Sequence, residues 1–220
     1  MQIPVLTIDG PSGAGKGTVS RALARHLHWN YLDSGSIYRS LAIAALNKQV
    51  DLQDIETLSK IASTMQLEFK CENELQVFLN GEEITPLLAT ETTGHAASVV
   101  AAYPEVRARL LQKQMDFQQL PGLVADGRDM GSVVFPDARF KVYLTASAEE
   151  RGLRRYKQLI EKGIDANLAQ ITQEIEARDW RDTQRTTAPL TIPKGALEID
   201  SSKMSIDEVI QRVLDLVQKG

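Results

Sequence analysis

The segment most informative about the fold is Gly10-Pro11-Ser12-Gly13-Ala14-Gly15-Lys16-Gly17-Thr18, which fits the pattern G-x-x-x-x-G-K. An apolar run at 3–8 precedes it, and apolar residues at helical spacing follow it over 19–27. A glycine-rich turn between a strand and a helix is the context in which this pattern binds nucleotide phosphates. The backbone N–H groups of such a turn can point into one hollow that binds an anion, and the start of the helix adds the positive end of its dipole there. We therefore predict that residues 10–18 bind the phosphates of ATP and that Lys16 reaches the β- and γ-phosphates.

One position of this loop departs from the common pattern, in which a Ser or Thr hydroxyl after the lysine binds magnesium. Gly17 stands there and Thr18 follows it. Thr18 could instead bond a phosphate oxygen, which leaves Mg²⁺ bound mainly through phosphates and waters. We expect Asp126, at the end of the apolar run 123–125, to orient those waters, because ligands gather at the C-terminal ends of parallel strands. Asp9 ends the first run in a similar way, and a structural role fits it as well as a metal-related one.

Short apolar runs recur between helical patterns along the chain. Five of them have the length and composition of strands: 3–8, 30–32, 123–125, 140–144 and 196–199. Strands that alternate with helices predict a three-layer α/β/α core around a five-stranded parallel sheet. The segment 66–85 differs, because apolar and polar residues alternate in it and Asn80-Gly81 is a typical hairpin turn. It predicts a small antiparallel insertion, although an edge continuation of the main sheet fits the same pattern.

The composition fits one α/β domain with an insertion. The chain has 220 residues, of which 43% are hydrophobic and 25% charged, and its net charge of −4 offers no general attraction for nucleic acids. The single cysteine, Cys71, excludes an internal disulfide framework and a Cys-rich zinc cluster. No apolar stretch approaches the length of a membrane span. We expect a cytoplasmic monomer without nucleic-acid or membrane partners.

Arginines gather in the C-terminal half of the chain. Six of them lie between residues 151 and 185: Arg151, Arg154, Arg155, Arg178, Arg181 and Arg185. Guanidinium groups stabilise a transferring phosphoryl group and align donor with acceptor, and a mobile segment carrying them could exclude water. A solvated helix face with Glu/Arg pairs explains part of the same cluster, especially near Glu149 and Glu150. The chain contains no Asn-Lys-x-Asp tetrapeptide, which argues against a GTPase switch.

Four segments together resemble the bacterial cytidylate kinases. They are 10–18, Asp33-Ser34-Gly35-Ser36-Ile37-Tyr38-Arg39, Asp126-Gly127-Arg128-Asp129-Met130-Gly131, and Arg178-Asp179-Trp180-Arg181-Asp182 with Arg185. The resemblance implies transfer of the γ-phosphoryl group of ATP, with Mg²⁺, to CMP or dCMP. It also implies one kinase domain with a core at 1–50, 104–147 and 186–220, a monophosphate-binding insertion at about 51–103 and a mobile lid at about 148–185. A kinase of UMP or AMP is the alternative, and an ATP-binding regulatory module is another.

The resemblance further implies a role for each matching site residue. Ser98, Arg107 and Asp129 would read the cytosine, since a carboxylate can accept from its exocyclic amine. The acceptor phosphate would be held by Arg39, Arg128 and Arg185, with Ser34 assisting. Arg178 and Asp182 would bind the sugar. The catalytic residues would be Lys16, Arg128, Arg154 and Arg185.

Overall fold

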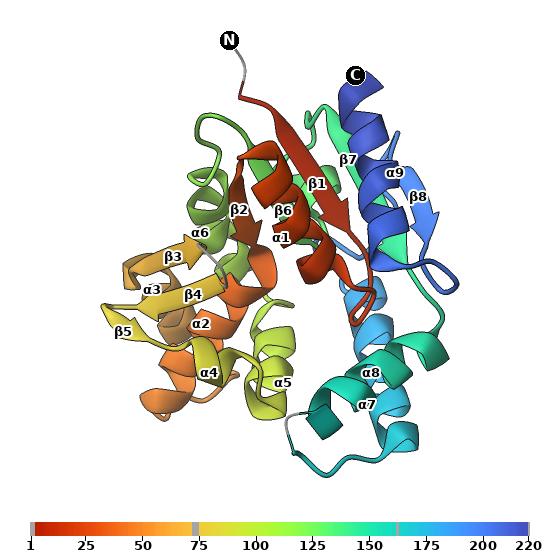
Figure 1. Ribbon diagram of the computed structural model, residues 1–220. Helices are drawn as coiled ribbons and strands as arrows, with labels where there is room; N and C mark the ends of the chain where they lie inside the picture. Colours follow the sequence, from red (N-terminus) through yellow and green to blue (C-terminus); the bar gives the residue numbers. More distant parts are fainter. Residues whose placement is uncertain (1–2, 72–74, 162, 220) are drawn as a thin grey trace. The chain divides into compact units, whose positions relative to one another are not determined.

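A computed structural model describes residues 3–71, 75–161 and 163–219 of the chain (Figure 1). The chain divides into two compact units, one formed by Met1–Leu32 with Gln118–Gly220 and the other by Asp33–Phe117. The strands are β1 (Val5–Asp9), β2 (Asn30–Asp33), β3 (Leu67–Cys71), β4 (Leu75–Leu79), β5 (Glu82–Glu83), β6 (Leu123–Gly127), β7 (Phe140–Thr145) and β8 (Leu197–Asp200). The helices are α1 (Lys16–Leu27), α2 (Ser34–Asn47), α3 (Ile55–Thr64), α4 (Thr85–Leu88), α5 (Glu91–Val100), α6 (Pro104–Met115), α7 (Ala148–Glu161), α8 (Leu168–Gln184), α9 (Ile206–Lys219) and the π-helical turn η1 (Met130–Val134).

A five-stranded sheet with the order β2-β6-β1-β7-β8 organises the first unit. β1 pairs in parallel with β6 and β7, and β7 pairs in parallel with β8. All residues of β1 and β6 are buried, as expected of central strands covered on both faces. Helices α1 and α9 pack against each other, α1 contacting β1 and β6, and α9 contacting β7. The C-terminal ends of β1 and β6 therefore lie side by side, next to the glycine-rich loop.

Two long helices of the first unit, α7 and α8, lie against each other (Figure 1). α7 follows β7 directly, and Ser147 caps its first turn by accepting from the backbone N–H of Glu150 at 3.2 Å. α8 starts after Asn167, whose side chain accepts from the N–H of Gln170 at 3.1 Å. These helices carry five of the six arginines of the C-terminal cluster, and the sixth, Arg185, follows α8 directly.

In the described part of the second unit, five helices accompany a separate three-stranded antiparallel sheet in the order β3-β4-β5. Asn80 and Gly81 connect β4 to β5 with φ of 51° and 87°, the positive values that a tight hairpin turn requires. Helix α2 is buried along most of its length and packs against α3, α4 and α5. Asp33 caps it, because its carboxylate accepts from the N–H of Ser36 at 3.1 Å and from the Ser36 hydroxyl at 2.6 Å.

The predicted α/β class, five-stranded parallel sheet and small antiparallel insertion are confirmed. The alternative, in which 66–85 continues the edge of the main sheet, is wrong, because the described residues of β3, β4 and β5 form a sheet of their own. The boundaries expected for the insertion and the lid stay predictions, as does the mobility of the lid. Within the described residues, no helix is both long enough and apolar enough to cross a membrane.

Candidate functional site

The loop after β1 owes its shape to three glycines. Gly10, Gly13 and Gly15 have φ of 150°, 77° and 92°. A Cβ atom at Gly10 would lie 1.9 Å from the carbonyl oxygen of Leu144, so a side chain cannot be accommodated there. Gly15 is the N-cap residue of α1, whose first turn contains neither a side-chain cap nor an acidic residue. The N–H groups at the start of α1 are therefore suited to an anion.

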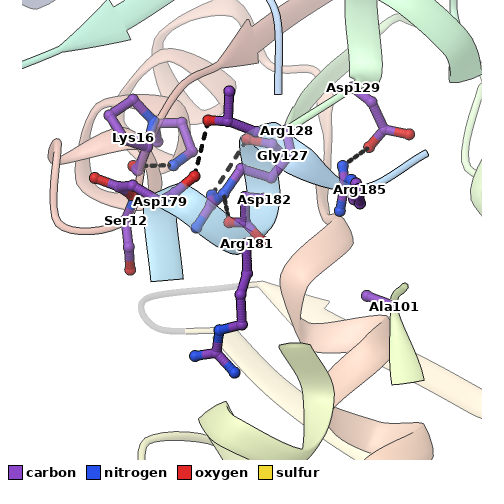
Figure 2. A network of polar contacts seen from close by, with 12 residues as sticks. Ser12, Lys16, Ala101, Gly127, Arg128, Asp129, Asp179, Arg181, Asp182 and Arg185 are labelled. Atoms are coloured by element: carbon purple, nitrogen blue, oxygen red, sulfur yellow. Dashed lines mark hydrogen bonds and ion pairs between the residues drawn. The ribbon is translucent and has the colours of Figure 1, made fainter. Parts of the chain in front are cut away.

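Lys16 is the first residue of α1, and its side chain is buried inside the loop. Its Nζ donates a hydrogen bond to the carbonyl oxygen of Pro11 at 2.8 Å (Figure 2). Burial and, second to it, the positive charge of Arg128 lower the pKa of Lys16 from its ordinary 10.5 to about 7. The carboxylates of Asp126 and Asp9 oppose this shift. A poorly solvated ammonium group of this kind gains strongly from a phosphate oxygen.

Asp126 lies in β6 and is almost fully buried. The hydroxyl of Tyr31 donates to its Oδ2 at 2.7 Å, and this oxygen lies 3.7 Å from the point where a Cβ atom at Gly17 would stand. The carboxylate is thus beside the first turn of α1, whereas Thr18 is exposed on that turn. Within the described residues, no group of three or more His, Cys, Asp or Glu side chains could hold a metal. One carboxylate beside a phosphate loop fits Mg²⁺, which keeps most of its waters.

Asp9 has a structural role in this fold. Its two carboxylate oxygens accept hydrogen bonds from the backbone N–H groups of Met130 and Gly131, both at 2.7 Å. Burial raises the pKa of Asp9 from 3.8 to about 6, although these two bonds oppose the shift. The end of β1 therefore fixes the start of η1, directly after Arg128 and Asp129. Of the two roles that the sequence left open for Asp9, the structural one has direct support.

Arg128 and Asp182 form a buried ion pair (Figure 2). The Nε of Arg128 donates to Oδ2 of Asp182 at 2.8 Å, and the two side chains are 17% and 10% exposed. Burial raises the pKa of Asp182, but Arg128 and Arg178 more than offset this, so that the pKa lies below its ordinary value. Asp182 is therefore ionised at neutral pH and holds Arg128 in place. The two segments 126–131 and 178–182 meet at this pair.

Asp129 and Arg185 form a second pair of neighbouring side chains (Figure 2). The Nη2 of Arg185 is 3.8 Å from Oδ1 of Asp129, and both side chains are almost fully buried. The Nε of Arg185 also donates to the carbonyl oxygen of Ala188 at 2.5 Å. These contacts bring together two of the residues predicted for the acceptor nucleotide.

Arg154 lies close to the glycine-rich loop. It donates to the carbonyl oxygen of Ser201 at 2.7 Å and to that of Ala14 at 3.4 Å, and it forms an ion pair with Glu150 at 3.7 Å. The pair with Glu150 is the helix-face contact that the sequence left open as an explanation for part of the arginine cluster. The catalytic role expected of Arg154 stays a prediction.

Ser34 and Arg39 belong to the second unit, on α2. The hydroxyl of Ser34 is buried and donates to Oε1 of Gln114 at 2.7 Å. The Nη1 of Arg39 donates to the carbonyl oxygen of Leu88 at 2.5 Å. Both side chains are therefore held in defined positions by neighbouring helices of the same unit.

Arg107 and Ser98 are the other predicted residues of the second unit. Arg107 is buried on α6, donates to the carbonyl oxygen of Ala101 at 3.2 Å and stacks over the ring of Tyr38 at 5.4 Å. The hydroxyl of Ser98 on α5 is buried and has no hydrogen-bond partner among the described residues. This hydroxyl can therefore donate to, or accept from, a bound group.

Several residues of the site were not anticipated from the sequence. Tyr31 bonds Asp126, Gln114 bonds Ser34, and Ser201 accepts from Arg154. Asp179 accepts from the backbone N–H of Ser12 in the loop at 3.4 Å. Of these, only Asp179 lies within a segment that carries the resemblance.

Comparison with known proteins adds to this geometry. The family model for cytidylate kinase matches residues 6–219. The chain belongs to the cytidylate kinase family. A cytidylate kinase of Methylococcus capsulatus is 55% identical over 98% of this chain and 97% of its own length. A cytidylate kinase of Stutzerimonas stutzeri is 53% identical over 98% of this chain and 95% of its own length.

Among solved structures, a gluconokinase from Sinorhizobium meliloti is similar, with a TM-score of 0.50 and 11% identity over 99% of this chain and 93% of that one. At this identity the likeness concerns the fold alone. The resemblance to the cytidylate kinase family that four short segments indicated is thus confirmed over nearly the whole chain.

Proposed function

We propose that this chain catalyses transfer of the γ-phosphoryl group of ATP to CMP and dCMP, which gives ADP with CDP or dCDP. Its membership of the cytidylate kinase family supports the reaction. The observation that carries the proposal is the geometry of the glycine-rich loop and of the segments beside it. Lys16 is buried at the start of α1, with its Nζ 2.8 Å from the Pro11 carbonyl oxygen. The ion pair of Arg128 with Asp182 brings together the segments proposed to bind the acceptor nucleotide.

On the donor side, the loop 10–18 provides backbone N–H groups for the triphosphate, and Lys16 provides a positive charge. Lys16 now bonds the Pro11 carbonyl, and in the proposed complex it exchanges that oxygen for one of ATP. Mg²⁺ bound with ATP would neutralise phosphate charge, and Asp126 would hold its waters. The hydroxyl of Tyr31 keeps the Asp126 carboxylate in one orientation.

On the acceptor side, the proposal assigns phosphate binding to Arg39, Arg128 and Arg185, with Ser34 assisting. Guanidinium groups suit this task, because their planar forks bind phosphate oxygens in pairs. Arg178 and Asp182 would bind the sugar. Because Asp182 is ionised, its carboxylate can accept hydrogen bonds from the sugar hydroxyls.

Cytosine recognition is assigned to Asp129, Arg107 and Ser98. Asp129 can accept from the N4 amine, which uracil replaces by an oxygen, so UMP should be disfavoured. Arg107 can donate to the acceptors of the ring. The buried hydroxyl of Ser98 supports a polar ligand near α5.

The reaction needs no general base, since the attacking group is an ionised phosphate oxygen of CMP. A bond forms between this oxygen and the γ-phosphorus, and the bond from that phosphorus to the bridging oxygen of ADP breaks. Lys16, Arg128, Arg154 and Arg185 would stabilise the charge on the transferring group. Positioning and charge neutralisation can supply the catalysis.

An ADP-release assay tests this proposal. The purified protein is supplied with ATP and Mg²⁺ and with CMP, dCMP, UMP, AMP, GMP or no acceptor. CMP and dCMP should give the highest kcat/KM, and ADP release without an acceptor should be slow. More efficient use of UMP or AMP than of CMP would overturn the cytosine assignment.

We also propose that the enzyme acts as a cytoplasmic monomer without nucleic-acid or membrane partners. The net charge of −4 supports the expectation for nucleic acids. Light scattering coupled to size-exclusion chromatography measures the mass directly. A mass near 24.4 kDa supports a monomer, and twice that mass contradicts it.

A further inference from the structure

Both polar backbone groups of Ser12, near the tip of the glycine-rich loop, are held by one ion pair. The Nη1 of Arg151, on α7, donates to the carbonyl oxygen of Ser12 at 2.9 Å. Oδ1 of Asp179, on α8, accepts from the N–H of Ser12 at 3.4 Å (Figure 2). The same Nη1 lies 2.5 Å from Oδ2 of Asp179. Two helices thus reach a single residue of the loop through one pair of side chains.

The arginine of this pair has a fixed position. Its side chain is 7% exposed, and its Nε donates to the carbonyl oxygen of Ala146, just after β7, at 2.9 Å. The loop also presses closely on α7, because a Cβ atom at Gly13 would lie 3.1 Å from the Cβ of Arg151. With φ of 77°, Gly13 could not carry a side chain without strain in any case. The loop backbone therefore rests on Arg151 at close range.

This contact determines the direction of an N–H group in the loop. In a planar trans peptide, the carbonyl of one residue and the N–H of the next point in opposite directions. Since Arg151 binds the carbonyl of Ser12, the N–H of Gly13 points away from Arg151. An N–H held in this way is directed before a phosphate arrives, so its binding requires less ordering of the loop.

We propose that Arg151 and Asp179 are positioning residues for the donor nucleotide, which hold the peptide of Ser12 so that the loop is shaped for the triphosphate. This inference rests on the proposed function and adds two residues to it. The pair acts through the loop backbone and not by touching the phosphates. It also connects both helices of the predicted lid to the loop. Its loss should therefore weaken ATP binding and leave CMP binding nearly unchanged.

The test uses three variants of the full chain: Arg151→Lys, Asp179→Asn and the double variant. Lysine keeps the charge of residue 151 but lacks the fork that reaches Ser12, Ala146 and Asp179 together. Isothermal titration calorimetry measures the Kd for ATP without an acceptor, and steady-state kinetics gives KM for ATP and for CMP. The loss of one charged hydrogen bond in the loop should raise the Kd for ATP about tenfold in each single variant. KM for CMP should change by less than about twofold, because the pair acts through the loop. A general loss of fold would instead impair the use of both substrates.

The double variant and a matched control sharpen the test. If the two residues act as one unit, the double variant should bind ATP about as weakly as the single variants, not about a hundredfold more weakly than the wild type. Glu176→Gln removes an exposed carboxylate from the same helix as Asp179 and should leave the Kd for ATP unchanged. Asp179 is 20% exposed, so Asp179→Asn provides the answer if Arg151→Lys fails to fold.

Three other results would contradict the proposal, and each would point to a different explanation. Variants with a lower melting temperature but an unchanged Kd for ATP would show that the pair only stabilises the fold. Tighter ATP binding by Asp179→Asn would show that its carboxylate competes with phosphate. Wild-type protein that binds no ATP would overturn the proposed function itself, whereas wild type and variants that bind ATP equally would overturn only the role of the pair.

Discussion

Replacing Lys16 by Met should stabilise the folded protein while it removes ATP use. Methionine has nearly the same length and is apolar, so it fits a buried position better than an ammonium group. Burial is the main cause that lowers the pKa of Lys16 from 10.5 to about 7. Since each pKa unit corresponds to about 1.4 kcal/mol, the charged lysine costs the folded state on the order of 5 kcal/mol.

Part of this gain is lost in the variant. Methionine cannot donate to the carbonyl oxygen of Pro11, and the loss of that charged hydrogen bond costs about 2 kcal/mol. Lys16→Met should therefore be more stable than the wild type by about 3 kcal/mol at pH 6, where the lysine is charged in both states. Above pH 7 the folded wild type releases this proton while the unfolded chain keeps it. The stability of the wild type then rises with pH, and by pH 8.5 the difference should shrink to about 1 kcal/mol.

Urea unfolding at pH 6 and pH 8.5, without nucleotide or phosphate, measures these differences. Lys60→Met changes an exposed lysine on α3 and should show no such dependence on pH. In the kinase assay, Lys16→Met should lose about a hundredfold or more in kcat/KM for ATP. A Lys16→Met variant that is less stable than the wild type at pH 6, or whose advantage does not shrink by pH 8.5, would show that burial of the lysine charge does not destabilise the fold.

Three further outcomes are expected. Gly10→Ala should abolish ATP binding, because its Cβ would lie 1.9 Å from a backbone carbonyl oxygen. At Gly17 an added Cβ would lie 3.2 Å from the flexible end of an arginine side chain. Gly17→Ala should therefore bind ATP with a Kd within about threefold of that of the wild type. Calorimetry compares the two, and equal losses would contradict the steric argument. Asp129→Ala should lower the preference for CMP over UMP at least about tenfold in kcat/KM, and an unchanged ratio would argue against cytosine reading by Asp129. The pKa of Lys16 is about 7, so the unliganded enzyme loses this positive charge as the pH rises above that value. KM for ATP should therefore increase between pH 7 and 8.5. A KM for ATP that stays constant from pH 6 to 8.5 would contradict this prediction.

The main sheet and the phosphate loop could be predicted because their signals are local. Each strand of the parallel sheet is a short apolar run, and the loop pattern lies between a strand and a helix. The antiparallel insertion followed from alternation and from Asn80-Gly81, whose positive φ values the structure shows. The strands β1 and β6 extend one or two residues beyond the apolar runs, because pairing continues as far as Asp9 and Gly127.

The contacts that organise the site could not be predicted in this way. Asp9 bonds backbone groups that lie 121 and 122 residues further along the chain, and Tyr31 bonds a carboxylate 95 residues away. Arg151 and Asp179 belong to different helices, and their common contact with Ser12 depends on how these helices pack. No pattern within a short window of sequence encodes such contacts, whereas the resemblance to a family could indicate the residues but not their partners.

A crystal structure of the protein with CMP and a non-hydrolysable ATP analogue would show both nucleotides in place. We expect the triphosphate to lie in the loop 10–18 and Nζ of Lys16 to have left the carbonyl of Pro11 for a phosphate oxygen. We also expect the N4 amine of cytosine to donate to Asp129. A triphosphate bound elsewhere, or a pyrimidine ring distant from Asp129, would contradict the proposed function.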